Sequence, residues 1–96
     1  MLIAHAYEEF LSYFELERGY TPATIQAYRS DGRLFMTFLE QNGHEQHVDE
    51  IKHRTIRQYI AWLRKRRLKS TSIARRLNSL RSFWKFVRDN EYTDRD

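Results

Sequence analysis

The stretch LKSTSIARRLNSLRSFWKF, from Leu68 to Phe86, decides the fold class of this 96-residue chain. Its apolar side chains recur every three or four residues, which is the spacing of one face of an α-helix. The opposite face carries Arg, Asn, Ser, Thr and Lys but no carboxylate. An exposed helix ordinarily mixes both charge signs, because Glu–Lys pairs one turn apart stabilise it. The stretch therefore predicts a helix whose exposed face is kept free of acid for a ligand outside the chain.

The composition favours one small all-α domain. Hydrophobic residues make up 41% of the chain and aromatic residues 15%, which suffices for a packed core. Only three Gly and one Pro are present, which argues against a many-turned β fold. The absence of Cys excludes a disulfide framework and a thiolate metal site. No apolar run is long enough to cross a membrane and no signal peptide is recognisable, so we expect a cytoplasmic protein.

The charge is distributed very unevenly along the chain. Residues 1–51 hold three Lys+Arg and nine Asp+Glu, whereas residues 52–88 hold thirteen Lys+Arg and no acid at all. Residues 89–96 hold one Arg and four acids, so the three parts carry −6, +13 and −3. A basic run of this length repels itself unless a polyanion supplies the missing charge. We therefore expect a nucleic acid as the partner, and a single surface that gathers the cations.

Four helices are predicted, at about 4–17, 22–42, 54–66 and 70–89. Thr21 and Pro22 are the residue types that cap and open a helix, and Ser70 is predicted to cap the last one. Gly19 and Gly43 are predicted to end the first two helices. The start of the third helix has no good cap, and Gly32 in the middle of the second predicts the close approach of a neighbouring helix.

The start of the last helix is the best candidate for a binding site. Free amides and the positive end of the helix dipole favour a phosphate there. Hydroxyl and basic side chains follow on the next turns, as in a helix that presents its first turns to DNA. The basic run Arg64–Lys69 just before it is interpreted as a phosphate clamp, although cations also stabilise a helix end without any ligand. The candidate residues are Lys69, Ser70, Thr71, Ser72, Arg75 and Ser79.

Other chemistries find little support in the sequence. His44 and His47 are of metal-ligand type, but nothing converges on them, so no metal site is predicted. No nucleophile–base pair, paired carboxylate or Gly-rich phosphate loop is recognisable, so no catalytic residue and no cofactor are expected. Most aromatic residues are assigned to the core, and only Trp62 and Phe86 are candidates for a stacking surface.

Two long stretches, FLSYFELERGYTPATIQAYRSDGRLFMTFLEQNG at 10–43 and VDEIKHRTIRQYIAWLRKRRLKSTSIARRLNSLRSFWKFVRDNEY at 48–92, resemble a known family. The sequence is similar to the N-terminal core-binding, SAM-like domain of the tyrosine recombinases, the phage integrase or Xer-like family. The resemblance implies a compact bundle of four helices, or of five, whose second and fourth helices face the major groove of DNA. On the second helix it points to Thr24, Gln26, Ala27 and Ser30, and on the fourth to Thr71, Ser72, Arg75 and Ser79.

The resemblance also implies what the chain lacks. It assigns residues 1–92 to the core-binding domain and 93–96 to the start of a linker toward an absent C-terminal catalytic domain. The family cuts DNA with a Tyr nucleophile and an Arg, Lys and His set in that other domain, and no His here is followed by an Arg three residues later. Implied partners are duplex DNA, the catalytic domain and other recombinase protomers. Two alternatives stay open: an unrelated small helical nucleic-acid-binding regulator, or a helical interaction module for an acidic protein.

Overall fold

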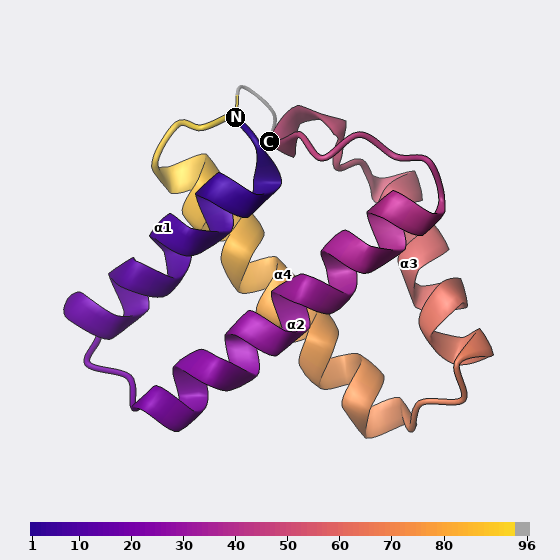
Figure 1. The fold of residues 1–96 in the computed structure, drawn as a ribbon, viewed down its shortest axis with the longest axis horizontal. Helices are drawn as coiled ribbons and strands as arrows, with labels where there is room; N and C mark the ends of the chain where they lie inside the picture. Colours follow the sequence, from indigo (N-terminus) through magenta and orange to yellow (C-terminus); the bar gives the residue numbers. More distant parts are fainter. Residues whose placement is uncertain (94–96) are drawn as a thin grey trace.

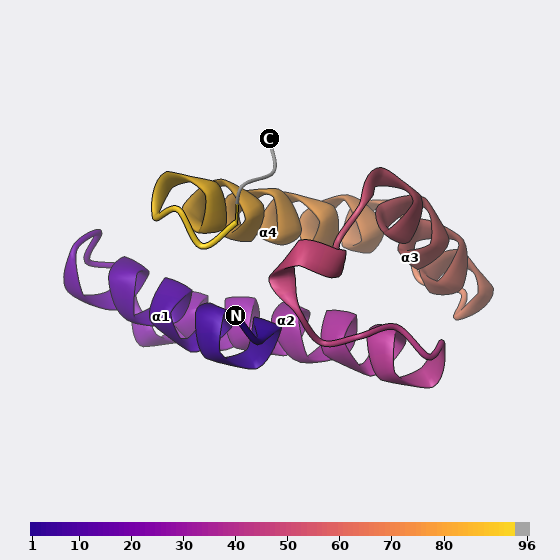
Figure 2. The same ribbon diagram turned by 90° about the horizontal axis from the view of Figure 1, so that it is seen from above.

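The chain folds as two helical hairpins that cross each other. The computed structural model describes residues 1–93, with α1 and α2 in one layer and α3 and α4 in the other (Figure 2). α2 and α4 cross near the middle of the molecule (Figure 1). The described residues form no β-strand, so the prediction of an all-α four-helix fold is confirmed. The elements are α1 (Ile3–Leu16), α2 (Pro22–Gln41), the short 3-10 helix η1 (Val48–Glu50), α3 (His53–Lys65) and α4 (Ser70–Asp89).

Phe10 lies at the centre of an aromatic cluster that joins three helices. Its ring centroid is 4.7 Å from that of Phe14 on α1, 5.9 Å from Tyr28 on α2 and 5.6 Å from Phe83 on α4. Aromatic pairs at such distances contribute about 0.5–1.5 kcal/mol each beyond the area that they bury. The apolar stripe of the first helix is buried as predicted, at Tyr7, Phe10, Leu11 and Phe14.

Gly32 marks a close contact between α1 and α2. A Cβ atom at this position would clash with Cε1 of Tyr7, because it would lie well inside van der Waals contact. The Tyr7 hydroxyl continues across α2 and donates a hydrogen bond of 2.6 Å to the carbonyl of Tyr28. Gly32 thus gives up helix propensity to let the Tyr7 ring lie against the α2 backbone, as the sequence predicted.

The starts of α2 and α3 are stabilised in different ways. Thr21 caps α2 by accepting a hydrogen bond of 3.3 Å from the backbone N–H of Thr24, with Pro22 as the first helical residue. At α3 the capping group comes from inside the helix, since Thr55 Oγ1 accepts the backbone N–H of Lys52 at 3.2 Å. The same buried hydroxyl donates to the carbonyl of Glu50. Thr55 was not among the predicted caps, because a capping residue is expected before the helix and not inside it.

The start of α4 corrects a prediction. Lys69, not Ser70, occupies the capping position, and Ser70 is the first helical residue. The Lys69 side chain accepts no capping hydrogen bond, because an ammonium group can only donate. The turn that leads into α4 holds Arg67 at a φ of 60°, a left-handed conformation that ordinarily favours glycine.

Both ends of the described chain lie at one edge of the molecule, on the side away from the starts of α2 and α4 (Figure 1). The N-terminal residues pair with the loop before η1, where the Ile3 N–H donates to the Gln46 carbonyl at 2.8 Å. Val48 and Ile51 are buried and anchor this loop, as predicted. At the other end the Thr93 hydroxyl donates to Asp49 at 2.8 Å. Residues 94–96 of the predicted linker lie outside the described part of the chain.

Candidate nucleic-acid interface

The first halves of α2 and α4 enclose a groove of about 400 Å³, called here the α2–α4 groove. Because the two helices cross, their N-terminal halves diverge toward the same edge of the molecule (Figure 1). Small or polar side chains line most of this groove. The lining residues are Ala23, Thr24, Ala27 and Tyr28 from α2 and Arg75, Asn78, Ser79 and Ser82 from α4.

Half of the predicted α2 residues lie in this groove. Thr24 and Ala27 line it, one turn apart. Gln26 and Ser30 are exposed but do not line it. At 100° per residue, Gln26 points about 160° away from Thr24, so the two side chains occupy opposite sides of α2.

The predicted residues at the start of α4 are accessible. Lys69, Ser70 and Thr71 are exposed and Ser72 is half-buried. Thr71 precedes Arg75 by four residues, so both lie on the same face of the helix. The first backbone N–H groups of α4 donate no hydrogen bond to the Lys69 side chain, and the positive end of the helix dipole lies at the same place.

Arg75 is held at the groove by a carboxylate that the sequence analysis did not single out. Its Nη1 donates a hydrogen bond of 3.0 Å to Asp31 Oδ2, and its Nη2 lies 3.0 Å from Asp31 Oδ1. The second contact is an ion pair without hydrogen-bond alignment, since Oδ1 accepts no hydrogen bond within the described residues. The Asp31 side chain is 2% exposed and that of Arg75 is 49% exposed. The carboxylate is therefore inside the protein while part of the guanidinium faces solvent.

Ser79 belongs to this same network rather than to the exposed surface. It is 2% exposed, and its hydroxyl donates a hydrogen bond of 2.6 Å to Asp31 Oδ2. Ser79 could therefore donate a hydrogen bond to a ligand only if this one broke. Arg75 and Ser79 are four residues apart on α4, and both face Asp31. This spacing, together with an acid in the middle of α2, is the sequence signal that could have identified the network.

The negative charge of Asp31 reaches into the core. Burial, and after it the charge of Asp31, raises the pKa of the Tyr7 hydroxyl above its ordinary value. Burial likewise raises the pKa of Tyr59, which Arg76 opposes. Both phenols thus stay neutral at physiological pH and act as core residues.

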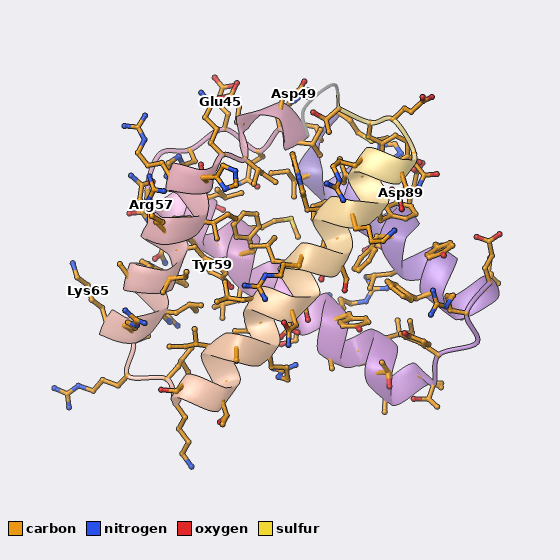
Figure 3. All side chains as sticks on the ribbon, turned by 180° about the vertical axis from the view of Figure 1, so that it is seen from behind. Glu45, Asp49, Arg57, Tyr59, Lys65 and Asp89 are labelled. Carbon is orange, nitrogen blue, oxygen red and sulfur yellow. The ribbon has the colours of Figure 1, made fainter. Side chains whose placement is uncertain are left out.

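A second basic surface lies between α3 and α4, and it divides the cations. This α3–α4 groove measures about 490 Å³ and has an apolar floor with a basic rim. Figure 3 views the molecule from the side of these two helices. The expectation of a single surface for the thirteen cations is wrong, because five of them, with one His, line this groove and only Arg75 lines the other. Its residues are Ile51, Lys52, His53, Ile56, Arg57, Ile60, Leu77, Leu80, Arg81, Trp84, Lys85 and Arg88.

The two grooves lie on opposite sides of α4. Taking Arg75 as the reference and 100° per residue, Ser82 lies within about 20° of it, whereas Leu77 and Trp84 lie about 160–180° away. One straight duplex cannot occupy both sides of a helix at once. The cations of the α3–α4 groove therefore need an explanation of their own.

The two aromatic side chains considered for stacking are engaged within the protein. Phe86 packs 5.7 Å from Phe10 and 5.4 Å from Tyr13, measured between ring centroids. Trp62 lies 5.5 Å from Phe38, and the guanidinium of Arg66 covers it at 4.6 Å. The geometry offers no open stacking platform at either residue.

The two histidines considered as metal ligands, His44 and His47, make local contacts within the protein. His47 Nδ1 accepts the backbone N–H of Asp49 and so caps η1, while its Nε2 hydrogen-bonds the N-terminal amine of Met1. The ring of His44 packs 5.5 Å from that of Phe38. None of the helices in the described residues is long and apolar enough to traverse a lipid bilayer.

The sequence model of the family described as Phage integrase, N-terminal SAM-like domain matches residues 7–91 of the chain. This match covers α2, α3 and α4 completely, α1 from Tyr7 onward, and both sides of the α2–α4 groove. The chain belongs to this phage integrase SAM-like domain family. The resemblance noted in the sequence is therefore confirmed over nearly its whole length.

Relatives of this integrase domain include curated bacterial recombinases. The chain is 43% identical over 81 residues to Tyrosine recombinase XerC of Lacticaseibacillus casei, a match that covers 81% of the chain and 26% of the relative. It is 35% identical over 89 residues to Tyrosine recombinase XerD of Staphylococcus saprophyticus, covering 93% of the chain and 30% of the relative. The chain thus spans about a quarter to a third of the length of these relatives. No solved structure matches it.

Proposed function

We propose that this SAM-like domain binds duplex DNA through the α2–α4 groove, as the N-terminal clamp half of a site-specific tyrosine recombinase. The observation that carries the proposal is the pairing of two helix starts at one edge, with Arg75 held between them by Asp31. Membership of the integrase family and the names of its relatives support a role in DNA recombination.

The proposed DNA contacts are of two kinds, those at the start of α4 and those inside the α2–α4 groove. Lys69, Ser70, Thr71 and the first amides of α4 are suited to phosphate oxygens, since they are exposed and lie at the positive end of the helix dipole. Arg75 is suited to a base edge, because guanidinium recognises guanine in the major groove through paired hydrogen bonds. Thr24 and Ala27 form the α2 wall, where Ala27 offers an apolar contact for a thymine methyl group.

The remaining parts of the proposal concern what lies outside this domain. DNA cleavage is assigned to a C-terminal catalytic domain reached through a linker that begins near residue 93. Other recombinase protomers bound to the same DNA are further proposed partners. A DNA-binding role of this kind also favours the cytoplasm as the location of the protein.

A titration with duplex DNA at several salt concentrations tests the proposal. If about five phosphates are neutralised, the logarithm of the binding constant should fall with the logarithm of salt concentration at a slope of roughly −4.5. The matched pair Arg75→Ala and Arg81→Ala removes one guanidinium from each side of α4. Arg75→Ala should weaken binding strongly and Arg81→Ala only slightly. A slope near zero, or equal losses in both variants, would contradict the proposal.

The α3–α4 groove favours a second candidate function, an interaction module for an acidic protein. An apolar floor between basic rims is the surface that an amphipathic acidic helix would cover. Trp84 lines this groove, so its fluorescence reports an occupant once Trp62 is replaced by Phe. An acidic amphipathic peptide should shift that fluorescence to the blue, and a scrambled peptide of the same composition should not. Equal fluorescence responses to both peptides would mean that the groove attracts acidic peptides through charge alone, which would contradict this candidate function.

A further inference from the structure

Asp31 is the one buried carboxylate among residues 1–93. It sits on α2 directly beside Gly32, the residue at which α2 meets α1. From α4 it receives the Ser79 hydroxyl at 2.6 Å and the Arg75 guanidinium at 3.0 Å. A charged group at such depth is costly unless it is paired and hydrogen-bonded, so its position in the protein is strongly determined.

The ion pair between Asp31 and Arg75 is asymmetric. The carboxylate is enclosed, with 2% of its side chain exposed, whereas 49% of the Arg75 side chain remains exposed on the wall of the α2–α4 groove. Only one N–H of Arg75 is used in a hydrogen bond to Asp31, so the other donors of the guanidinium stay available. The half-exposed cation keeps part of its hydration, so the pair joins α2 to α4 at a lower desolvation cost and still presents donors on the groove wall.

We infer that Asp31 is a positioning residue for DNA recognition: it fixes the guanidinium of Arg75 so that this group meets one base pair. This inference rests on the proposed DNA-binding function. An unrestrained arginine carries a long flexible side chain and pairs readily with any phosphate within its reach. Held by a buried carboxylate, the same side chain is ordered before DNA arrives, and its planar donors point in one direction.

Asp31 also lowers the electrostatic attraction of the groove for DNA of any sequence. Its negative charge offsets that of Arg75, so the pair adds little net attraction for phosphates. Ser79 secures the carboxylate from the same face of α4 and thereby keeps it aimed at Arg75. The network therefore lowers the affinity for DNA of any sequence and raises the preference for one sequence. Removal of the Asp31 charge should raise the former and lower the latter.

The test compares two duplexes, one selected from a randomised pool by the wild-type chain and one with the same bases in scrambled order. Asp31→Asn keeps the side-chain shape and removes the charge. Its ratio of affinities for the selected and scrambled duplexes should fall about fivefold or more, while its affinity for the scrambled duplex stays equal or rises. In an Arg75→Ala background the same substitution should leave the ratio unchanged, because Asp31 acts through Arg75. Glu8→Gln, which breaks the surface ion pair with Arg29, is the matched control and should leave the ratio unchanged.

The outcomes separate the inference from the function on which it rests. If the wild-type chain selects no duplex, the proposed function fails. If it selects one and Asp31→Asn keeps the full ratio, or lowers it equally in the Arg75→Ala background, the positioning role is overturned. Should Asp31→Asn not fold, the wild-type chain still decides: nitrogen-15 spectra should show slow rotation of the Arg75 guanidinium in the free protein. Fast rotation there would overturn the inference as well.

Discussion

The two sides of α4 carry positive charge in opposite ways. The α2–α4 groove holds one arginine, tied to a buried acid and surrounded by small polar side chains. The α3–α4 groove holds several cations, spread around an apolar floor and without a carboxylate in its lining. If the proposed function holds, the difference teaches that the number of basic residues on a surface does not by itself identify the face that reads DNA. An ordered arginine at a diverging pair of helix starts is the stronger indication, because recognition of a base needs a fixed geometry.

The largest expected effect is on stability, and it comes from a substitution in α2, which forms a wall of the α2–α4 groove but not of the α3–α4 groove. Gly32→Ala would place a methyl group against the Tyr7 ring, so α1 and α2 must separate. We expect a loss of about 1–3 kcal/mol in the free energy of unfolding, since overpacking outweighs the gain in helix propensity. Urea denaturation measures it. A more stable variant would mean that the Tyr7 ring moves aside without cost.

The next effect separates the two grooves directly. Arg75→Ala should weaken binding to a selected duplex by about 1–3 kcal/mol, because a base contact is lost. Arg88→Ala, on the rim of the α3–α4 groove, should lower that affinity only by the small amount expected for the loss of one distant, salt-screened charge. Fluorescence anisotropy at a fixed salt concentration measures both. Identical losses of affinity would mean that the two grooves contribute equally to DNA binding, which would contradict the distinction drawn between them.

A smaller effect distinguishes the proposed phosphate contacts at the start of α4 from the proposed base contact of Arg75. Lys69→Ala should weaken selected and scrambled duplexes alike and should make the salt slope less steep by about 1. The expectation follows from the exposed ammonium group at the start of α4, which offers charge and no fixed geometry. A loss confined to the selected duplex would instead assign Lys69 to sequence recognition.

The smallest effect concerns the turn between α3 and α4. Arg67 adopts a φ of 60°, which glycine tolerates better than other residues. Arg67→Gly should therefore raise the free energy of unfolding by up to about 1 kcal/mol while removing one cation near the proposed DNA-facing edge. Thermal unfolding at two pH values below 9 checks this. Destabilisation would show that the Arg67 side chain makes a contact worth more than the backbone strain.

Much of the fold could be predicted from the sequence because helical periodicity is a local property. The spacing of apolar residues gave the four helices and the buried stripe of α1 to within about two residues. Thr21 and Pro22 marked the start of α2, and Gly32 marked its contact with α1. These features depend on neighbouring residues or on one face of one helix.

The rest depended on how the helices cross, which periodicity does not contain. Ser79 was taken for an exposed residue, although the crossing of α2 over α4 buries it against Asp31. Ser70 was taken for a cap, although the helix begins at Ser70 itself. The cations were expected on one surface, although the packing of α3 against α4 turns many of them to the other side. In each case the answer lies in the relative placement of two helices that are distant in sequence.

Backbone amide shifts, recorded by nuclear magnetic resonance while a selected duplex is added to the wild-type chain, test the central claim most directly. DNA in the α2–α4 groove should shift the amides of Thr24 to Ala27 and of Ser70 to Arg75, while the indole signal of Trp84 stays in place. Shifts concentrated around Arg57, Arg81 and Trp84, with the starts of α2 and α4 unaffected, would contradict the account.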